Sequence, residues 1–480
     1  MPSLLTSSSV PVAVISRPGV DYAPAPYGPP SAVYEMVEAA FSRLGLDGGR
    51  AGTAAWNPLS DVIQPGDRVV IKPNFVTNQN FHTRLTGEHL SCASTHASVL
   101  RPIIDYALRA AGPRGRVSVV DSPAEGCNLD EVVRALGVRD LLADYRRRGF
   151  EIPLIDLRHF RIVPRMLLDN LQRAGRSWNL GLLQHERLDG DPLGYHVVDL
   201  AARSRFAEVH ERAARLAFHR AHPRTPVSHH SDGRHEYSLP RTVLSADAII
   251  TVAKMKTHKK SGVTLALKSA IGLTNQKYWL PHYTRGTVEE GGDEYPLRPP
   301  ALSRLRNQLQ RVSLPPPFAD HSLVARAPLV AQSAGITMDG FVVEGSWEGN
   351  DTLWRTTLDL CHALHYADHE GRLHDRPVRQ HLALVDGIFA SEGEGEGEGP
   401  LASTPKRAGL LVAGRDPVLV DHVATQIMGF DPQRVPTVRE ALRRPLLPTS
   451  DLARLDTRQD GPLPDSPFVP PSTWPSLRMP

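Results

Sequence analysis

Cysteine is the rarest residue in this chain of 480 residues, with three copies at Cys92, Cys127 and Cys361. Their wide separation excludes the CxxC spacing of a zinc or iron–sulfur site. An odd and sparse set of cysteines is typical of reduced thiols in a cytoplasmic protein. We therefore expect a cytoplasmic protein without an iron–sulfur cluster.

Long hydrophobic runs and a strong net charge are also missing. The start, MPSLLTSSSVPVAVISRPGV, lacks the basic and apolar regions of a signal peptide, and no window is long enough for a membrane span. The net charge is +3, from 55 basic and 52 acidic side chains, so neither nucleic acid nor a membrane is expected as a partner. The GxxxxGK(S/T), GxSxG and HExxH motifs are absent, which argues against a nucleotide kinase, an ordinary serine hydrolase and a simple zincin.

Lysine is scarce as well, but its few copies are concentrated. Eight of the 55 basic residues are lysine, and six of these lie within the 24 residues from Lys254 to Lys277. Arginine supplies positive charge almost everywhere else, whereas a desolvated lysine can lose its proton and act as a nucleophile. A charge run is usually a solvated face, but this run is embedded in apolar sequence. We interpret it as the candidate functional centre.

Strand and helix patterns alternate along much of the chain. They predict an α/β fold with a doubly wound, mostly parallel sheet, an inserted segment and an irregular Pro-rich tail. The expected strands are 10–15, 67–76, 116–121, 248–253, 381–388 and 409–413. The expected helices are 31–46, 96–111 (capped by Ser94 or Thr95), 129–136, 264–271, 351–364 and 417–428.

Composition divides the chain into four parts. We expect an irregular arm at 1–30, an α/β domain at 31–300 with an insertion at about 158–240, a second α/β part at 301–445 that completes the same site, and an irregular tail at 446–480. The run EGEGEGEG from Glu392 reads as a flexible acidic loop and only weakly as a metal site.

The basic segment KMKTHKKSGVTLALK directly follows a predicted strand. Lys254, Lys256 and His258 should therefore emerge at the carboxyl end of this strand, with Lys268 on a helix that faces back. Cations gathered in this way favour a phosphate or carboxylate, and crowded ammonium groups lower one another's pKa. We expect Gly262 to let the backbone approach a ligand closely. Ligand or cofactor binding is assigned to Lys72, Asn74, Lys254, Lys256, Thr257 and Gly262.

Other candidates follow neighbouring strands. His96 lies at a predicted helix start and is either an acid/base group or a structural residue. Asp121 follows a buried strand, a position often functional in parallel sheets. Asp386 follows another strand and either complements the lysines or holds Mg²⁺, with a plain solvent loop as the rival interpretation.

Several phrases along the chain carry a family resemblance. They are VVIKPNFV, STHASVLRPII, VVDSP, ADAIITVAKMKTHKKSGVTLALKSAIGL, NQKYWLPH, LVDGIFASEGEG and AGRDPVLVD. Between about Val69 and Asp421 the chain resembles the family named domain of unknown function 362. The activity of that family is largely unassigned. Some relatives carry ferredoxin-like iron–sulfur domains. Because this chain lacks the cysteines of such a domain, the resemblance does not imply a redox role for it.

A weaker similarity concerns one histidine, a lysine ten residues later and a further histidine. His258, Lys268 and His282 are similar in arrangement to residues of the nickel-pincer lactate racemase family. The resemblance implies that the lysine tethers a nucleotide-derived nickel cofactor and that histidines bind metal or move protons, with His96 as a second acid/base group. The phrase SGVTLAL stands where the racemases have a glycine-rich one.

These observations predict an enzyme that acts on a small anionic substrate, in an isomerase- or transferase-like reaction. A redox or metal-handling accessory protein and a non-catalytic anion- or nucleotide-binding protein remain as alternatives, and a homo-oligomer stays open. The expected catalytic residues are His258, Lys268, His96 and Asp121. The expected ligands of a divalent metal, nickel or magnesium, are His282, Asp386 and Glu392.

Overall fold

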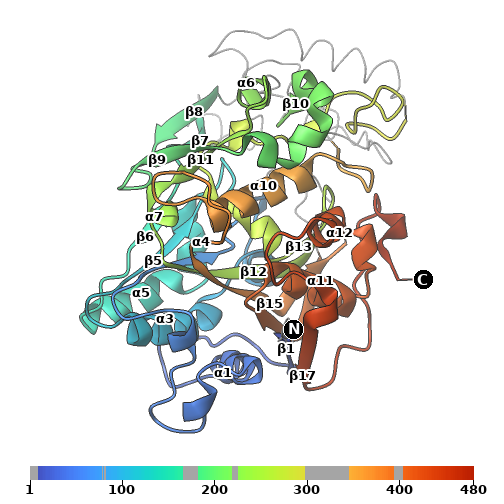
Figure 1. Cartoon of the computed structure of the whole chain (residues 1–480). Helices are drawn as coiled ribbons and strands as arrows, with labels where there is room; N and C mark the ends of the chain where they lie inside the picture. The colour runs from blue at the N-terminus through green and yellow to red at the C-terminus, as the bar shows by residue number, and fades with distance from the viewer. Residues whose placement is uncertain are drawn as a thin grey trace, which may run out of the picture.

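The computed structural model describes residues 9–77, 79–80, 83–165, 182–218, 225–297, 345–393 and 404–479. A nine-stranded sheet occupies its centre (Figure 1). In spatial order the strands are β17 (Leu455–Asp460), β1 (Val10–Ser16), β16 (Thr404–Gly414), β15 (Gln380–Glu392), β12 (Ala248–His258), β2 (Arg68–Pro73), β5 (Arg116–Asp121) and β6 (Leu154–Asp156), with β13 (Gly262–Thr264) paired to β12.

The central strands run in one direction. β12 is parallel to both of its neighbours, β15 and β2, and the pairs β2–β5 and β5–β6 are parallel too. β16 is antiparallel to β15 and to β1. The sheet is therefore mixed but mostly parallel, which confirms the predicted α/β class. Because parallel strands end at one edge, polar residues after β2, β5, β12 and β15 are brought together there.

Helices cover both faces of the sheet (Figure 1). One face packs against α1 (Ala32–Leu44), α3 (Ala97–Ala111), α4 (Leu129–Ala135) and α5 (Val138–Arg147). The other face packs against α7 (Arg241–Leu244), the 3-10 helix η6 (Leu267–Leu273), α10 (Leu353–Tyr366), α11 (Pro417–Ile427) and α12 (Pro436–Arg443).

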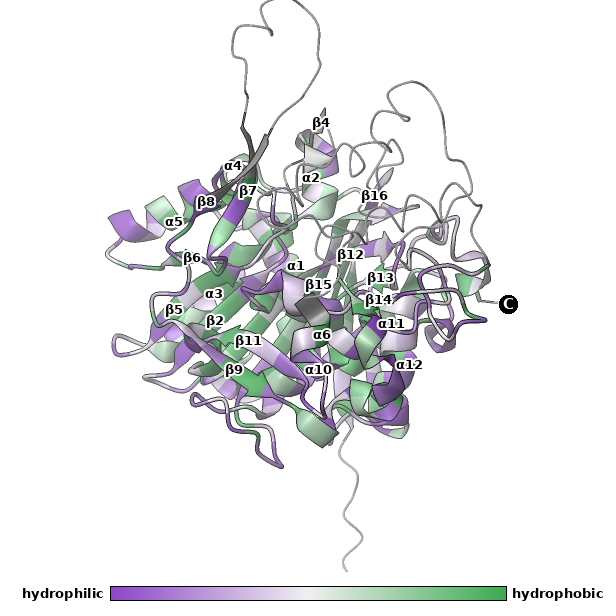
Figure 2. Cartoon of the chain, turned by 90° about the horizontal axis from the view of Figure 1, so that it is seen from above, coloured by the Kyte–Doolittle hydropathy of each residue, from purple (hydrophilic) through white to green (hydrophobic). Residues whose placement is uncertain are grey.

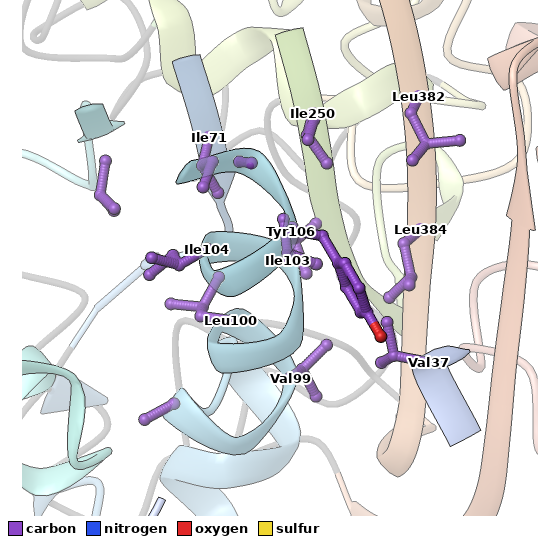
Figure 3. Packing of buried hydrophobic residues seen from close by; sticks show 14 of the residues in the cluster. Val37, Ile71, Val99, Leu100, Ile103, Ile104, Tyr106, Ile250, Leu382 and Leu384 are labelled. Atoms are coloured by element: carbon purple, nitrogen blue, oxygen red, sulfur yellow. The ribbon is translucent and has the colours of Figure 1, made fainter. Parts of the chain in front are cut away.

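The packing on the first face is seen around α3. Leu100 and Ile103 of this helix point toward Ile71 of β2 and Ile250 of β12 (Figure 3). The central strands are apolar on both faces, and the hydrophilic residues gather on the outer helices (Figure 2). Burial on both faces explains why these strands read as continuous apolar runs in the sequence.

Between β6 and β12 the chain leaves the main sheet. It forms small two-stranded sheets, in which β7 (Phe160–Arg165) pairs with β8 (Leu182–Arg187) and β9 (Tyr195–Asp199) pairs with β11 (Glu236–Pro240). β10 (Leu216–Ala217) reaches forward to β14 (Tyr283–Thr284), and the short helix α6 (Thr225–His229) lies nearby (Figure 1). The segment predicted as an insertion thus adds a layer above the sheet.

The structure corrects three local expectations. The predicted helix 264–271 is present only as the 3-10 helix η6, which begins at Leu267, and Thr264 belongs to strand β13. The residue that caps α3 is His96, because its ring accepts from the backbone of Ser98, and neither Ser94 nor Thr95 takes this place. The tail is not wholly irregular, because β17 forms an edge of the main sheet parallel to β1.

The C-terminal segment also contacts the predicted functional centre. Trp474 is buried and donates from Nε1 to the backbone oxygen of Lys259 at 2.7 Å. The nearest atom of its ring lies 3.1 Å from the point that a Cβ on Gly262 would occupy. Gly262 has φ +74°, so it both makes the β12–β13 turn and leaves room for Trp474. The expected close approach at Gly262 is thus to the tail of the chain rather than to a ligand.

Within the described ranges, none of the helices has the length and apolar character needed to cross a bilayer.

Replacing Trp474 with alanine should destabilise the protein by about 3–5 kcal/mol, because a large buried side chain and one hydrogen bond are lost. Urea unfolding followed by fluorescence measures this loss. Val469→Ala in the same segment is the matched control, since Val469 is exposed, and it should change stability by less than about 0.5 kcal/mol. Equal effects of the two substitutions would show that the tail does not pack as described.

Candidate functional site

Two of the eight lysines are neutralised by aspartates at the carboxyl edge of the sheet. Lys72 Nζ lies 2.8 Å from Asp121 Oδ1, and both side chains are almost completely buried. Lys254 Nζ lies 3.0 Å from Asp386 Oδ2, with neither side chain exposed. Burying a charge is costly unless a partner compensates it, so each pair is a structural unit. Each aspartate therefore forms an ion pair with its lysine, so both amines already have a partner.

The second pair includes a tyrosine from the N-terminal segment. Tyr22 donates from its hydroxyl to Asp386 at 2.9 Å, and Lys254 Nζ lies 2.9 Å from the same hydroxyl. Burial, followed by the charge of Asp386, raises the pKa of Tyr22 well above its usual value, so the phenol keeps its proton. The ring of Tyr22 stacks on His96 with centroids 4.3 Å apart.

His96 belongs to a separate pocket. Its Nδ1 accepts from the backbone N–H of Ser98 at 3.1 Å, so the remaining proton sits on Nε2. Burial and the charge of Lys254 lower the pKa of His96 to about 4. An open pocket of about 420 Å³ is lined by His96 together with Glu88, Arg134 and other residues, but not by His258, Lys268 or His282. His96 thus lines a pocket that those three residues do not line.

Two predicted binding residues serve the local structure. Asn74 donates from Nδ2 to the carbonyl of Ala93 at 2.9 Å, and its backbone is bound to Thr95. Thr257 donates to the carbonyl of Gly393 at 2.8 Å. Both side chains are buried. They tie the loops after β2 and β15 to the sheet edge.

Lys256 points to the same face of β12 as Lys254. Its Nζ donates to the carbonyl of Ala93 at 3.0 Å and is fully buried. Burial lowers the pKa of Lys256 well below its usual value, and the positive charge of Lys268 lowers it further. Lys256 and Lys268 therefore lie near enough to sense each other's charge.

Lys268 differs from the paired lysines. It is partly exposed, and its amine has no hydrogen bond or ion pair within the described part of the chain. Burial, followed by the charge of Lys260, lowers its pKa to about 7. At neutral pH a large fraction of this amine is therefore unprotonated and can accept a proton or attack an electrophile.

The backbone around Lys268 is fixed from two helices. Asp421 of α11 accepts from the backbone N–H groups of Ala266 and Leu267 at 2.7 and 2.9 Å. Cys361 of α10 donates from its thiol to the carbonyl of Leu267 at 3.3 Å. These contacts hold the residues that precede Lys268, so the site has a rigid support.

His258 and His282 present opposite hydrogen-bonding groups. His258 Nδ1 accepts from the backbone N–H of Lys260 at 3.0 Å, which leaves a proton on Nε2. His282 Nδ1 lies 3.0 Å from the carbonyl of Leu280 and must carry the proton, which leaves a lone pair on Nε2. Burial lowers the pKa of both rings well below the usual value, and the charge of Lys268 contributes to each. One neutral donor and one neutral acceptor are thus both within reach of the charge of Lys268.

The three predicted metal ligands do not form a group. Asp386 is bound by Lys254 and Tyr22, and Glu392 pairs with Lys406 at 3.1 Å. Across the described ranges no set of three His, Cys, Asp or Glu side chains is placed to hold a metal ion. His282 has the tautomer of a metal ligand, whereas His258 has its free nitrogen protonated. The donor set therefore does not fit a nickel or magnesium centre made by these side chains, and we derive no chemical step from a metal.

Sequence reasoning missed several supporting residues. Tyr22 and Asp421 are remote from the basic segment, and no local pattern connects them to it. Gly272 directly follows the predicted helix 264–271, where a glycine reads as an ordinary helix end, so no signal of a close approach was present in the sequence. A Cβ on Gly272 would stand 2.6 Å from Lys72 Nζ and 2.7 Å from Asp121 Oδ1. η6 thus rests directly on the first ion pair.

The fold and site describe an α/β protein with a lysine–histidine centre at the carboxyl edge of its sheet. Residues 189–426, which contain this centre, match the family described as "Domain of unknown function (DUF362)". The chain belongs to this family, as its phrases predicted. The similarity to nickel-pincer lactate racemases stays a prediction.

Two individual proteins are also similar to this chain. The "Thylakoid-associated protein sll1697" of Synechocystis sp. is 36% identical over 75 residues, which cover 16% of this chain and 22% of that protein. The chain therefore matches less than a quarter of the curated relative's length. A crystal structure of a protein from Thermotoga maritima aligns over 79% of this chain and 55% of its own at 10% identity, with a TM-score of 0.29. That score is too low to support a conclusion.

Replacing Gly272 with alanine should destabilise the protein by about 1–3 kcal/mol, because the added methyl group meets the Lys72–Asp121 pair. Chemical unfolding measures the effect. Gly49→Ala is the matched control, since a Cβ there meets nothing within 4 Å and should be close to neutral. A neutral Gly272→Ala would contradict the close approach of η6.

The Lys254–Asp386 pair gives a second stability prediction. Lys254→Met should cost about 3–5 kcal/mol, because it leaves the Asp386 carboxylate buried without its cation. Lys254→Met combined with Asp386→Leu should cost much less than the two single changes together. Arg146→Met, which removes an exposed pair with Glu151, is the control and should change the stability little. Additive losses in the double variant would argue against a coupled pair.

Proposed function

We propose that this protein is an enzyme that moves a proton on a small anionic substrate, with Lys268 as the base. The observation that carries the proposal is the contrast between Lys268 and the two lysines that are paired with aspartates. Lys72 and Lys254 are neutralised by aspartates, whereas Lys268 lacks such a partner in the described chain, is reachable by solvent and has a pKa of about 7. A base poised near neutral pH is what proton abstraction requires.

The two histidines extend this chemistry. Removal of a proton next to a carboxylate or carbonyl sends the electron pair onto oxygen, where negative charge develops. His258 offers an N–H that can donate to such an oxygen, and His282 offers a lone pair that can accept a proton. The surrounding lysines favour a substrate with negative charge. An isomerase-like reaction agrees with this division of roles.

Solvent-exchange measurements test the proposal. Small 2-hydroxy, 2-oxo and phosphorylated acids are incubated with the protein in D2O, and loss of the C–H signal is followed by NMR. Lys268→Met should lower the exchange rate about 10²–10⁴-fold. The rate should rise as the pH rises through about 7, because the amine acts after losing its proton.

Lys406→Met is the matched control, because Lys406 is already paired with Glu392 and has no assigned role in the reaction, and it should retain the exchange rate. Exchange that persists unchanged in Lys268→Met would exclude this lysine as the base. If the wild-type protein bound anions and exchanged none of them, the non-catalytic anion-binding alternative would replace the enzyme.

A further inference from the structure

Asp421 of α11 is a buried carboxylate without a countercharge. Its side chain belongs to a residue that is 2% exposed, and no Lys, Arg or His forms an ion pair with it in the described part of the chain. Asp121 and Asp386, by contrast, each pair with a lysine. Burying a charge is costly unless a partner compensates it, so the unpaired carboxylate of Asp421 requires an explanation.

Both oxygens of Asp421 accept hydrogen bonds from successive backbone N–H groups. Oδ1 accepts from Ala266 at 2.7 Å, and Oδ2 accepts from Leu267 at 2.9 Å. These groups stand at the start of η6, where Ala266 has no side-chain group that could cap the helix. A protonated carboxyl group would turn a hydroxyl toward one of the two N–H groups, which places a donor against a donor. The ionised form of Asp421 is therefore the one that makes both bonds.

Apolar contacts hold the same segment independently of this charge. Ala266 lies in a buried cluster with Leu419 of α11, and Leu267 lies in another with Leu358 of α10. These contacts remain when Asp421 takes up a proton. Protonation should therefore loosen the start of η6, which carries Lys268, while the surrounding structure stays folded.

Few groups near Asp421 can change charge. Burial, followed by the charge of Asp416 at the start of α11, raises the pKa of Asp421 to about 7. From α10 comes the thiol of Cys361, whose pKa burial raises, so it stays protonated. η6 contributes Lys268, whose pKa is lowered by burial and then by the charge of Lys260. Strands β1, β15 and β16 and helix α12 present apolar side chains to α11.

We propose that Asp421 is a positioning residue for Lys268, and that its ionised carboxylate keeps the start of η6 in the place where the amine of Lys268 is a base. When Asp421 is protonated, η6 loosens, the amine reaches more water and it regains its proton. The inference rests on the proposed function for the reaction that Lys268 performs. The link between the two residues can be measured without a substrate.

Two physical effects predict opposite results for the substitution Asp421→Asn. If Asp421 acted on Lys268 through its charge, its removal would lower the pKa of Lys268, because a negative charge favours the ammonium form. If Asp421 acts through position, its removal lets water reach the amine, and the pKa of Lys268 rises towards its usual value. The direction of the change therefore separates the two explanations.

Competitive labelling of the full chain with acetic anhydride measures this pKa, because the reagent attacks unprotonated amines and peptide mass spectrometry reports on Lys268 alone. In Asp421→Asn, labelling of Lys268 at about pH 7 should fall about tenfold or more, which corresponds to a rise of one pKa unit. In the wild-type protein the logarithm of the labelling rate should rise between about pH 5.5 and 7 with a slope that approaches two, because both residues must lose a proton.

Asp359→Asn is the matched control. Asp359 of α10 is also fully buried, but it accepts from the backbone of Arg205 and from the hydroxyls of Ser204 and Tyr237. This substitution should leave the labelling of Lys268 and its slope unchanged. The wild-type slope requires no variant, so the inference stays testable if Asp421→Asn does not fold. A wild-type slope of one, or labelling of Asp421→Asn that is equal or faster, would overturn the positioning role.

Solvent exchange separates this inference from the proposed function. If labelling of Lys268 depends on Asp421 and the wild-type protein exchanges no substrate, the positioning role stands and the enzyme proposal fails. If exchange depends on Lys268 while Asp421→Asn labels and exchanges like the wild type, the enzyme stands and the positioning role is wrong. If both are right, Asp421→Asn lowers kcat more than it raises KM, because it acts on the base and not on substrate binding.

Discussion

The arrangement of positive charge at one edge of the sheet is the constraint on which the rest depends. β2 and β12 each carry a buried lysine, Lys72 and Lys254, and each lysine needs a carboxylate within contact distance. Asp121 and Asp386 provide these carboxylates from neighbouring strands. The order of the strands in the sheet therefore decides whether each buried lysine is neutralised. Gly272 then lets η6 lie on the first pair. The position of Lys268 follows from this layering.

Much of the fold was readable because the central strands are buried on both faces. Continuous apolar runs predicted β2, β5, β12, β15 and β16, and the helices between them followed from spacing and caps. β17 was missed for a physical reason. It reads LDTRQD, has no buried face and lies at an edge of the sheet, so hydrophobic patterning carried no signal.

The candidate site was only partly predictable. Strand ends indicated Lys72, Asp121, Lys254 and Asp386, but the sequence could not show that these four neutralise one another. Lys256, His258, Lys268 and His282 were singled out by spacing, and the charge of Lys268 lowers the pKa of each of the other three. Contacts across long sequence separations, such as Tyr22 with Asp386 and Asp421 with Leu267, depend on packing that no local pattern encodes.

The edge formed by β1 has a consequence for how the chain is made. β1 is synthesised first, yet its neighbours β16 and β17 emerge only after residues 404–414 and 455–460. Until then β1 presents unpaired backbone groups and an apolar face, a state that invites aggregation. Trp474 emerges later still and closes over the turn after β12. On the ribosome, the turn after β12 therefore lacks its packing against Trp474 until the chain has been synthesised beyond this tryptophan.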